Sequence, residues 1–533
     1  MAEPARDTQA AASTEASSTP PPPQPPPRLG RLIAVGSFFA VLQRIVLRGL
    51  GLFSTLLLVR LLSPEDFGVA AVAGAMLTLL EMLTATSFGL ALIRMPAPEP
   101  RHYDTAFTLT VLRGVLIGGG MIGLADLQAA LIGDARVADV MWLIALTALL
   151  QSFESIRMID LQREFRFDRL MAYNVFQKVL GIAITLPLAF WLRNYWALVL
   201  AAPIGRLATL PLSYWLAPYR PRLSLAAWRE MFNFSKWLLL GNVCSFLDTQ
   251  SMNWIIGWFE GVAAVGLYQV AYQVAALPIS EIAAPIRQPI YAGFARVYHD
   301  LAALRRQFMT GLELQWVVVL PMSVGVALTA PELTLLFLGD RWVALVPLMP
   351  LVALFALFDG LGQYTHNVFI VLHRQALFVA TCFFAVLVRI AATTYGAVHD
   401  GLAGAAWAML ATSVLNTVIW QAQASRLMQL SARALLGGLW RSALAVLVMA
   451  GAVLASPVGL PDMIGLTAWP VLSGLLLKAV LGASVFAVSI LLLWRVAGAP
   501  PDSAEAIALR ALRGFLKRAG LGRRAKMISK PME

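Results

Sequence analysis

Arg44 and Arg48 are the residues of this sequence whose placement most clearly calls for a chemical partner. They stand four positions apart in the apolar stretch 36–60, so on a helix they share one face. A guanidinium group in hydrocarbon is costly unless it meets water, an acid or a bound anion. Paired guanidinium groups match phosphate oxygens through parallel hydrogen bonds. The spacing therefore predicts a site for water or for an anion near the middle of the first helix.

Other cations also interrupt apolar stretches: Arg113, Lys178, Arg206, Arg287, Arg389 and Lys478. The first half of the chain has five such cations, counting the Arg44 and Arg48 pair, against one well-buried acid, Glu81, which predicts a net positive cavity. We expect Arg44, Arg48, Arg113, Arg206 and Arg287 to bind the substrate. Lys178 and Arg206 have the alternative of extending to the membrane surface. Arg389 and Lys478 are expected to be structural, and Lys478→Ala to be nearly silent.

Acidic residues at similar depth are fewer. Glu81 is positioned to neutralise Arg44 or Arg48, while Asp248, Asp359 and Glu281 are candidates for binding a coupling proton or sodium ion, by analogy with other secondary transporters. A structural Asp–Arg pair is an equal alternative for the aspartates. No other cofactor and no metal site is expected.

The elements that carry these charges are membrane helices. The chain has 533 residues, of which 59% are hydrophobic and 13% charged, a composition outside the range of soluble domains. A membrane-spanning helix needs roughly 20 apolar residues. About fourteen stretches qualify: 36–60, 67–93, 104–125, 139–157, 169–190, 196–217, 234–257, 263–295, 307–330, 343–372, 375–396, 401–425, 441–460 and 465–494. The fold class predicted is an all-α polytopic membrane protein.

The distribution of Lys and Arg residues predicts how the chain is oriented in the membrane. Most of the 41 Lys and Arg residues fall at the two ends or in alternate gaps between the apolar stretches, and the intervening gaps carry acids such as Glu65, Asp134 and Asp400. Loops rich in Lys and Arg remain in the cytoplasm. Both termini are therefore predicted to be cytoplasmic, and membrane lipids are expected partners. No nucleic-acid partner is expected.

A weak internal repeat suggests two halves. Residues 58–69 and 256–267 align so that Gly68 matches Gly266, each opening a helix after a short acidic turn. Two lobes related by an axis along the membrane normal are typical of parallel-repeat transporters. The predicted organisation is a disordered Pro-rich head (1–30), an N-lobe of six helices (31–217), a basic linker (218–236), a C-lobe of six helices (237–430), two accessory helices (431–498) and a basic amphipathic tail (499–533).

Enzymatic functions find little support. The sequence contains neither a G-x-x-x-x-G-K-[ST] phosphate loop nor an H-E-x-x-H zinc motif. The gaps between helices are too short to hold a catalytic domain. A transporter is favoured over an enzyme.

The segments 61–68 (Leu-Leu-Ser-Pro-Glu-Asp-Phe-Gly), 88–94 (Phe-Gly-Leu-Ala-Leu-Ile-Arg) and 103–109 (Tyr-Asp-Thr-Ala-Phe-Thr-Leu), with Arg113-Gly114, resemble the polysaccharide and O-antigen flippases. These are Wzx-like members of the multidrug/oligosaccharidyl-lipid/polysaccharide exporter superfamily. The resemblance is sharpest over 55–115. It implies two pseudo-symmetric six-helix lobes, here with two further helices, and alternating access that moves a polyprenyl-pyrophosphate-linked oligosaccharide.

The resulting expectation is an inner-membrane flippase that serves exopolysaccharide or O-antigen export. A lipid-linked oligosaccharide is the expected substrate, with polysaccharide polymerase and glycosyltransferases as further partners. A multidrug-type cation antiporter and a flippase for the peptidoglycan lipid precursor remain alternatives. A non-transporting scaffold of a glycan assembly complex is the competing class. A cation antiporter would need carboxylates in its cavity, so the excess of buried arginines favours an anionic substrate.

Overall fold

The structure is a computed structural model that describes residues 27–84, 92–93, 95, 98–164, 166–228, 236–283, 290, 293–294, 296–456, 468–500, 503–506 and 509–510. Within these ranges, the side chains of 27–37, 236–246, 248–249, 282–283, 375 and 468 are outside the description. The predicted Pro-rich head lies outside the described residues up to position 26, as does the basic tail from 511 onward. The first helix begins at Pro27, so it includes the last four positions assigned to the head.

All the regular secondary structure of the described residues is helical, which confirms the predicted fold class. The first half contains α1 (Pro27–Leu61), α2 (Pro64–Leu83), α4 (Pro100–Ile132), α5 (Arg136–Ser152), α6 (Met158–Arg163), α7 (Phe167–Leu192) and α8 (Trp196–Leu216). The second contains α10 (Lys236–Ala275), η1 (Ile279–Ala283), α12 (Leu301–Leu328), α13 (Ala330–Leu333), η2 (Thr334–Leu338), η3 (Asp340–Leu345), α14 (Met349–Val371) and α15 (Gln375–Met428). Two last helices follow, α16 (Ala432–Leu454) and α17 (Ala468–Val496).

Ten of the described helices are long and apolar enough to cross a membrane. Two of the long elements are each two helices joined at a bend. Gly261 breaks α10 with a positive φ of 79°, and Asp400 and Gly401 break α15. Both bends fall in gaps predicted between spans. With α5 and α14 added, and each bent element taken as two, the described residues contain the fourteen helices expected from the sequence.

Some boundaries differ from those predicted. The eighth stretch, 263–295, is not one helix: regular α-helix ends at Ala275 and is followed by the π-helical turn η1. Pro278 precedes this turn, and a proline removes a backbone donor and disrupts an α-helix. α16 begins nine positions before its predicted stretch, because Ser431 caps it by accepting a hydrogen bond from the Ala434 amide.

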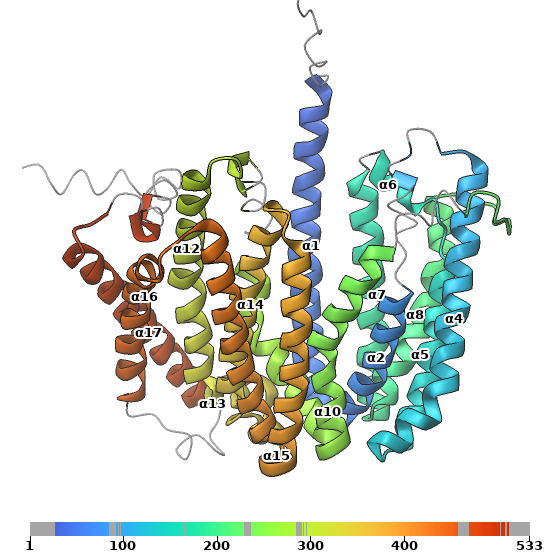
Figure 1. The fold of residues 1–533 in the computed structure, drawn as a ribbon. Helices are drawn as coiled ribbons and strands as arrows, with labels where there is room; N and C mark the ends of the chain where they lie inside the picture. The colour runs from blue at the N-terminus through green and yellow to red at the C-terminus, as the bar shows by residue number, and fades with distance from the viewer. Residues whose placement is uncertain are drawn as a thin grey trace, which may run out of the picture.

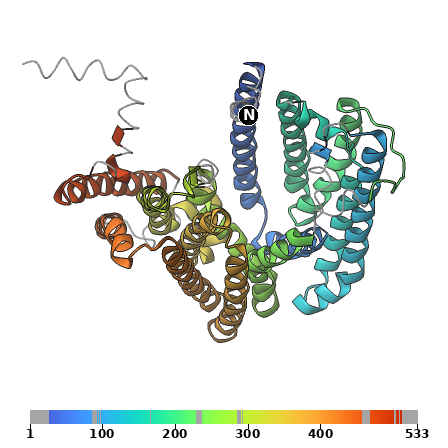
Figure 2. The same cartoon turned by 45° about the horizontal axis from the view of Figure 1, so that its top comes forward.

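The helices form two lobes. In Figure 1, α2, α4, α5, α7 and α8 gather on one side and α12, α14, α15, α16 and α17 on the other, with α1 and α10 between them; Figure 2 shows the same separation. Here the N-terminal lobe means α1–α8 and the C-terminal lobe means α10–α15. α4 packs on α5, and α7 packs on both α1 and α8. In the second half, α14 packs on α15 and α12, while α16 packs on α12 and α17.

The two lobes meet where α2 begins. Ser63 and Asp66 form a capping box: the Ser63 amide donates to Asp66 Oδ2 at 2.8 Å, and the Asp66 amide donates to Ser63 Oγ at 3.3 Å. Pro64 occupies the first helical turn, where its missing N–H costs nothing. The motif 61–68 therefore fixes the start of α2 and its direction of entry.

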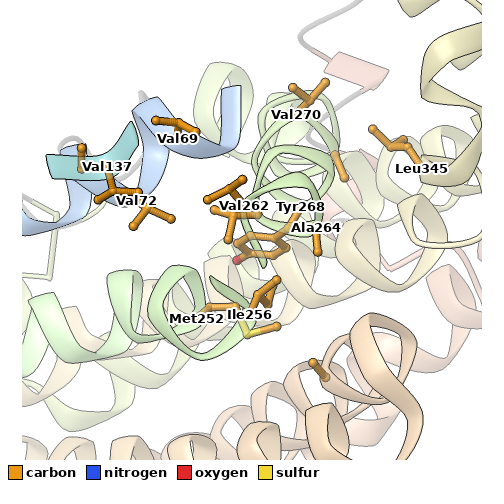
Figure 3. Packing of buried hydrophobic residues seen from close by; sticks show 14 of the residues in the cluster. Val69, Val72, Val137, Met252, Ile256, Val262, Ala264, Tyr268, Val270 and Leu345 are labelled. Atoms are coloured by element: carbon orange, nitrogen blue, oxygen red, sulfur yellow. The ribbon is translucent and has the colours of Figure 1, made fainter. Parts of the chain in front are cut away.

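Gly68 and Gly266 touch each other across this lobe interface. A Cβ on Gly68 would overlap the Val262 carbonyl oxygen, and a Cβ on Gly266 would overlap the Pro64 carbonyl oxygen. The two contacts are related by the same alignment that pairs Gly68 with Gly266 in the sequence repeat. The repeat thus corresponds to a pseudo-two-fold contact between α2 and α10, and Figure 3 shows side chains of both helices in the surrounding core, among them Val69, Val72 and Ile256.

Candidate functional site

Arg44 and Arg48 lie on α1, and both reach the same turn of the C-terminal lobe. Arg44 Nη2 donates to the Ser280 carbonyl oxygen at 3.0 Å, and Arg48 Nη2 donates to Ser280 Oγ at 3.1 Å. Arg48 Nε also lies 2.7 Å from Glu281 Oε1. The shared face predicted from their spacing is therefore present, and it forms a polar bridge between the two lobes.

This bridge is not a closed, dry contact. The side chains of Arg48 and Glu281 are 41% and 33% exposed, and Arg44 is exposed. Glu281 is the carboxylate that faces Arg48, whereas Glu81 was the expected partner. The cations predicted to bind substrate and an acid predicted to bind a coupling ion thus belong to one cluster, which we call the α1–η1 cluster (Arg44, Arg48, Ser280, Glu281).

Arg113 occupies a different place, inside the N-terminal lobe. Its Nε donates to Thr84 Oγ1 at 3.1 Å and its Nη2 donates to the Glu81 carbonyl oxygen at 3.0 Å, so it ties α4 to the end of α2. Arg113 and Glu81 line a cavity of about 370 Å³ between α2, α4, α5, α6 and α7, together with Glu154, Tyr173 and Asn174.

Arg206 reaches the same cavity indirectly. Its Nη1 lies 3.9 Å from Glu154 Oε2, and both side chains are less than a third exposed. Glu154 is thus the acid that compensates Arg206, and this acid lies in the loop after α5. The Lys178 side chain lies beside Gly51, with its Nζ 3.8 Å from where a Cβ of Gly51 would be, so Lys178 faces α1.

The C-terminal lobe holds the predicted acids. Asp359 Oδ1 on α14 lies 3.9 Å from Arg389 Nη2 on α15. The Arg389 side chain is 5% exposed, and its guanidinium carbon lies 5.4 Å from the centroid of the Phe355 ring. This is the Asp–Arg pair that the sequence left as an alternative to ion coupling. Arg287 lies outside the described residues, and so does the side chain of Asp248, whose backbone belongs to α10.

The end of the lobe interface at the start of α2 is closed by aromatic and backbone contacts. Trp342, fully buried, donates from Nε1 to the Val59 carbonyl oxygen at 2.9 Å, and its ring packs edge-on against Phe67. Arg60 donates to the Phe337 carbonyl oxygen at 3.2 Å and also to that of Leu336. The positive-inside pattern predicts this end to be the outer side of the membrane, which leaves the α1–η1 cluster on the inner side of the closure.

Comparison with known proteins agrees with this architecture. A family model described as "Polysaccharide biosynthesis protein" matches residues 57–347, more than half of the chain. The chain belongs to this family. The resemblance to polysaccharide flippases, first indicated by residues 61–68, is thereby confirmed, and the protein is a multi-pass membrane protein of polysaccharide biosynthesis.

Two relatives and one solved structure illustrate the match. The lipopolysaccharide biosynthesis protein WzxC of Escherichia coli K12 is 22% identical over 398 residues, which cover 72% of this chain and 79% of WzxC. The succinoglycan biosynthesis transport protein ExoT of Rhizobium meliloti 1021 is 25% identical and covers 71% of this chain and 77% of ExoT. The fold resembles the inward closed lipid II flippase MurJ, with a TM-score of 0.63 at 12% identity over 87% of this chain and 99% of MurJ.

The sequence identified the charged residues of the site but not the residues that contact them. Ser280, Glu154 and Trp342 were not among the predicted site residues, yet each contacts a predicted residue or closes the lobe interface. Trp342 follows Arg341 in a predicted external gap. A tryptophan beside a charged turn was the one feature of the sequence that could have indicated its role at the lobe interface. The Ser and Glu partners carry no such signal, since they come from distant segments.

Proposed function

We propose that the protein moves a polyprenyl-pyrophosphate-linked oligosaccharide from the cytoplasmic to the outer leaflet of the inner membrane by alternating access. The observation that carries this proposal is the α1–η1 cluster: two arginines of one lobe, four positions apart, on the surface that faces the other lobe. Membership in a family of polysaccharide biosynthesis proteins supports the glycan as cargo. The two guanidinium groups would bind the diphosphate.

The ion pair in this cluster suggests how binding is linked to lobe movement. Glu281 now compensates Arg48, and Ser280 joins both arginines to η1. A diphosphate would replace these oxygens around the guanidinium groups and release η1 from α1. Because α1 and η1 belong to different lobes, substrate binding would then break one inter-lobe contact, as alternating access requires. Glu281, freed from Arg48, is the group we propose to accept a coupling cation; the Asp359 carboxylate already faces Arg389.

Arg44→Ala/Arg48→Ala is expected to lose most of its transport activity at normal membrane abundance. A hydrogen bond to a charged group contributes about 1.5–3 kcal/mol, and every 1.4 kcal/mol corresponds to about tenfold in affinity. Lysine replacements should restore activity only in part, because an ammonium group lacks the guanidinium fork. The measurement is accumulation of lipid-linked glycan on the cytoplasmic leaflet, with protein level determined in parallel.

Two variants serve as controls for this experiment. Arg306→Ala, an exposed arginine of α12, removes one positive charge elsewhere and should transport normally. Glu281→Gln keeps both arginines and should retain substrate binding while changing the ion dependence of transport. Normal flux in the double arginine variant would exclude the cationic site.

The proposed orientation has its own test. Reporter fusions after Arg169, Lys236 and Met428 should report the cytoplasm, and fusions after Asp134 and Asp400 the outside. Asp134 follows the end of α4 and Asp400 lies in the bend of α15, so the two external sites belong to different lobes. An external signal at Lys236 would be incompatible with cytoplasmic termini and with the same orientation of both lobes.

A further inference from the structure

A second basic site lies at the predicted cytoplasmic end of the N-terminal lobe. A cavity of about 440 Å³ is formed by the start of α4, the loop after α5 and the segment that follows α8. Arg157, Arg220 and Arg222 line it, with Asp104 as the one acid among its described lining residues. These arginines are separate from the α1–η1 cluster and from the cavity of Arg113, so the proposed transport step does not use them.

The aromatic wall of this cavity is held in place by its own hydrogen bonds. Tyr219 donates from its hydroxyl to Asp104 Oδ1 at 2.7 Å, and burial raises the pKa of the Tyr219 phenol, which keeps this donor protonated. Tyr103 donates to Asp160 at 2.6 Å, and the Arg157 guanidinium lies over the Tyr103 ring at 5.2 Å. Asp104 therefore accepts a hydrogen bond from Tyr219 and forms no ion pair with the arginines of the described cavity lining.

The segment that carries two of the arginines is fixed to α4. The Ser224 amide donates to Thr108 Oγ1 at 2.8 Å, and the Ala227 amide donates to Thr105 Oγ1 at 3.2 Å. Ala227 is 2% exposed. Arg220 and Arg222 therefore lie on a segment whose backbone is anchored to α4. This anchoring reduces the conformational entropy lost when the arginines bind a ligand.

The guanidinium groups themselves lack acidic partners. Across the described part of the chain, none of Arg157, Arg220 and Arg222 has a carboxylate within ion-pair distance, and all three are exposed. Three cations around one cavity repel each other unless an anion joins them. The geometry therefore favours a ligand with several acceptor oxygens, such as a phosphate group.

The surroundings indicate where that phosphate comes from. Trp215 and Leu223 are 77% and 76% exposed, and Trp228 is 46% exposed, on both sides of Arg220 and Arg222. Exposed tryptophan and leucine next to arginine are typical of segments that lie in the headgroup region of a membrane. The cavity thus opens at the level where lipid phosphates are found.

We propose that this cavity binds the phosphate headgroup of an acidic glycerophospholipid of the inner leaflet and so anchors the N-terminal lobe. Basic pockets between helices on the cytoplasmic side commonly bind anionic headgroups. The lobe would then keep a fixed position in the bilayer while the other lobe moves against it.

Native mass spectrometry of the purified full-length protein tests the proposal. Phosphatidylglycerol should bind more tightly than phosphatidylcholine, and Arg157→Gln/Arg220→Gln/Arg222→Gln should weaken phosphatidylglycerol binding by about tenfold or more, since each arginine near an anionic surface contributes on the order of fivefold. The matched control is Arg296→Gln/Arg306→Gln/Arg433→Gln, three exposed arginines of the second half of the chain, which should leave this binding unchanged.

Competition experiments distinguish a phospholipid headgroup from free phosphate and from the transported lipid. Inorganic phosphate and a short-chain prenyl diphosphate should compete poorly with phosphatidylglycerol; strong competition by the prenyl diphosphate would overturn the proposal and assign the cavity to the transported lipid. Equal phosphatidylglycerol binding by the two triple variants would also overturn it. A photoreactive phosphatidylglycerol on the wild-type protein should label peptides containing Tyr214 and Tyr219, a result that does not depend on how the variants fold, and labelling confined to other peptides would contradict the site.

Discussion

Gly68→Ala is expected to open the contact between the lobes at the start of α2 and to lower the thermal stability of the protein. A Cβ at position 68 would overlap the backbone carbonyl oxygen of Val262, and a backbone atom cannot rotate away as a side chain can. α2 and α10 would have to separate, and Trp342 would lose its place between Val59 and Phe67. Overpacking of a well-packed core costs about 1–3 kcal/mol and occasionally more.

Gly74→Ala is the matched control for this substitution. It lies on the same helix α2, but a Cβ there would meet nothing within 4 Å, so the variant should behave as wild type. Gly266→Ala should reproduce the Gly68 effect, because its Cβ would overlap the Pro64 carbonyl oxygen. The measurements are the melting temperature in detergent and the distance between spin labels on the predicted outer loops of the two lobes. A Gly68→Ala protein with wild-type melting temperature and an unchanged distance would refute the close backbone contact.

Lys478→Met is expected to destabilise the protein strongly, in contrast to the near-silent effect that the sequence suggested for loss of this lysine. Lys478 Nζ on α17 lies 2.5 Å from Glu332 Oε1 on α13, and the two side chains are 8% and 0% exposed. Among the described residues neither Glu332 oxygen has a hydrogen bond of normal geometry, so the ammonium supplies the compensating charge. Removing one member of a buried ion pair costs about 3–5 kcal/mol.

The double variant Lys478→Met/Glu332→Met distinguishes the ion pair from simple packing. Replacing both members with apolar side chains of similar volume is often neutral or stabilising, so the double variant should recover most of the lost stability. Arg433→Met, an exposed position in the first turn of α16, controls for removal of a positive charge. Membrane abundance and melting temperature are the readouts. If Lys478→Met melts like the wild type, Glu332 does not depend on Lys478.

A third buried ion pair connects α16 to the chain that follows α17. Arg441, the first residue of the predicted stretch 441–460, lies in α16 and is 6% exposed. Its Nε and Nη2 donate to Glu505 at 2.8 and 3.2 Å. The Ala504 amide next to it lies 3.4 Å from Glu313 Oε2 on α12, so the chain just after α17 folds back onto α12 and α16.

Features that depend only on neighbouring residues could be predicted from the sequence. Runs of about 20 apolar residues produce membrane helices whatever they pack against, and each predicted stretch contains a helix in the described chain, although the eighth ends early, at Ala275. The Ser63–Asp66 capping box is complete within four positions, so the start of α2 follows from local chemistry alone. Arg44 and Arg48 share a face because the helical period places them there.

The pairing of the buried charges could not be predicted from the sequence, because it depends on how the helices pack. Arg48 pairs with Glu281 rather than Glu81, Arg389 with Asp359, and Lys478 with Glu332. The two partners of each pair come from different helical elements, and no local spacing in the sequence indicates which acid meets which cation. Helical period and hydropathy predict the depth of a side chain in the membrane and the helix face on which it lies. Its partner depends on how whole helices pack, and close backbone contacts such as that of Gly68 with Gly266 determine this packing.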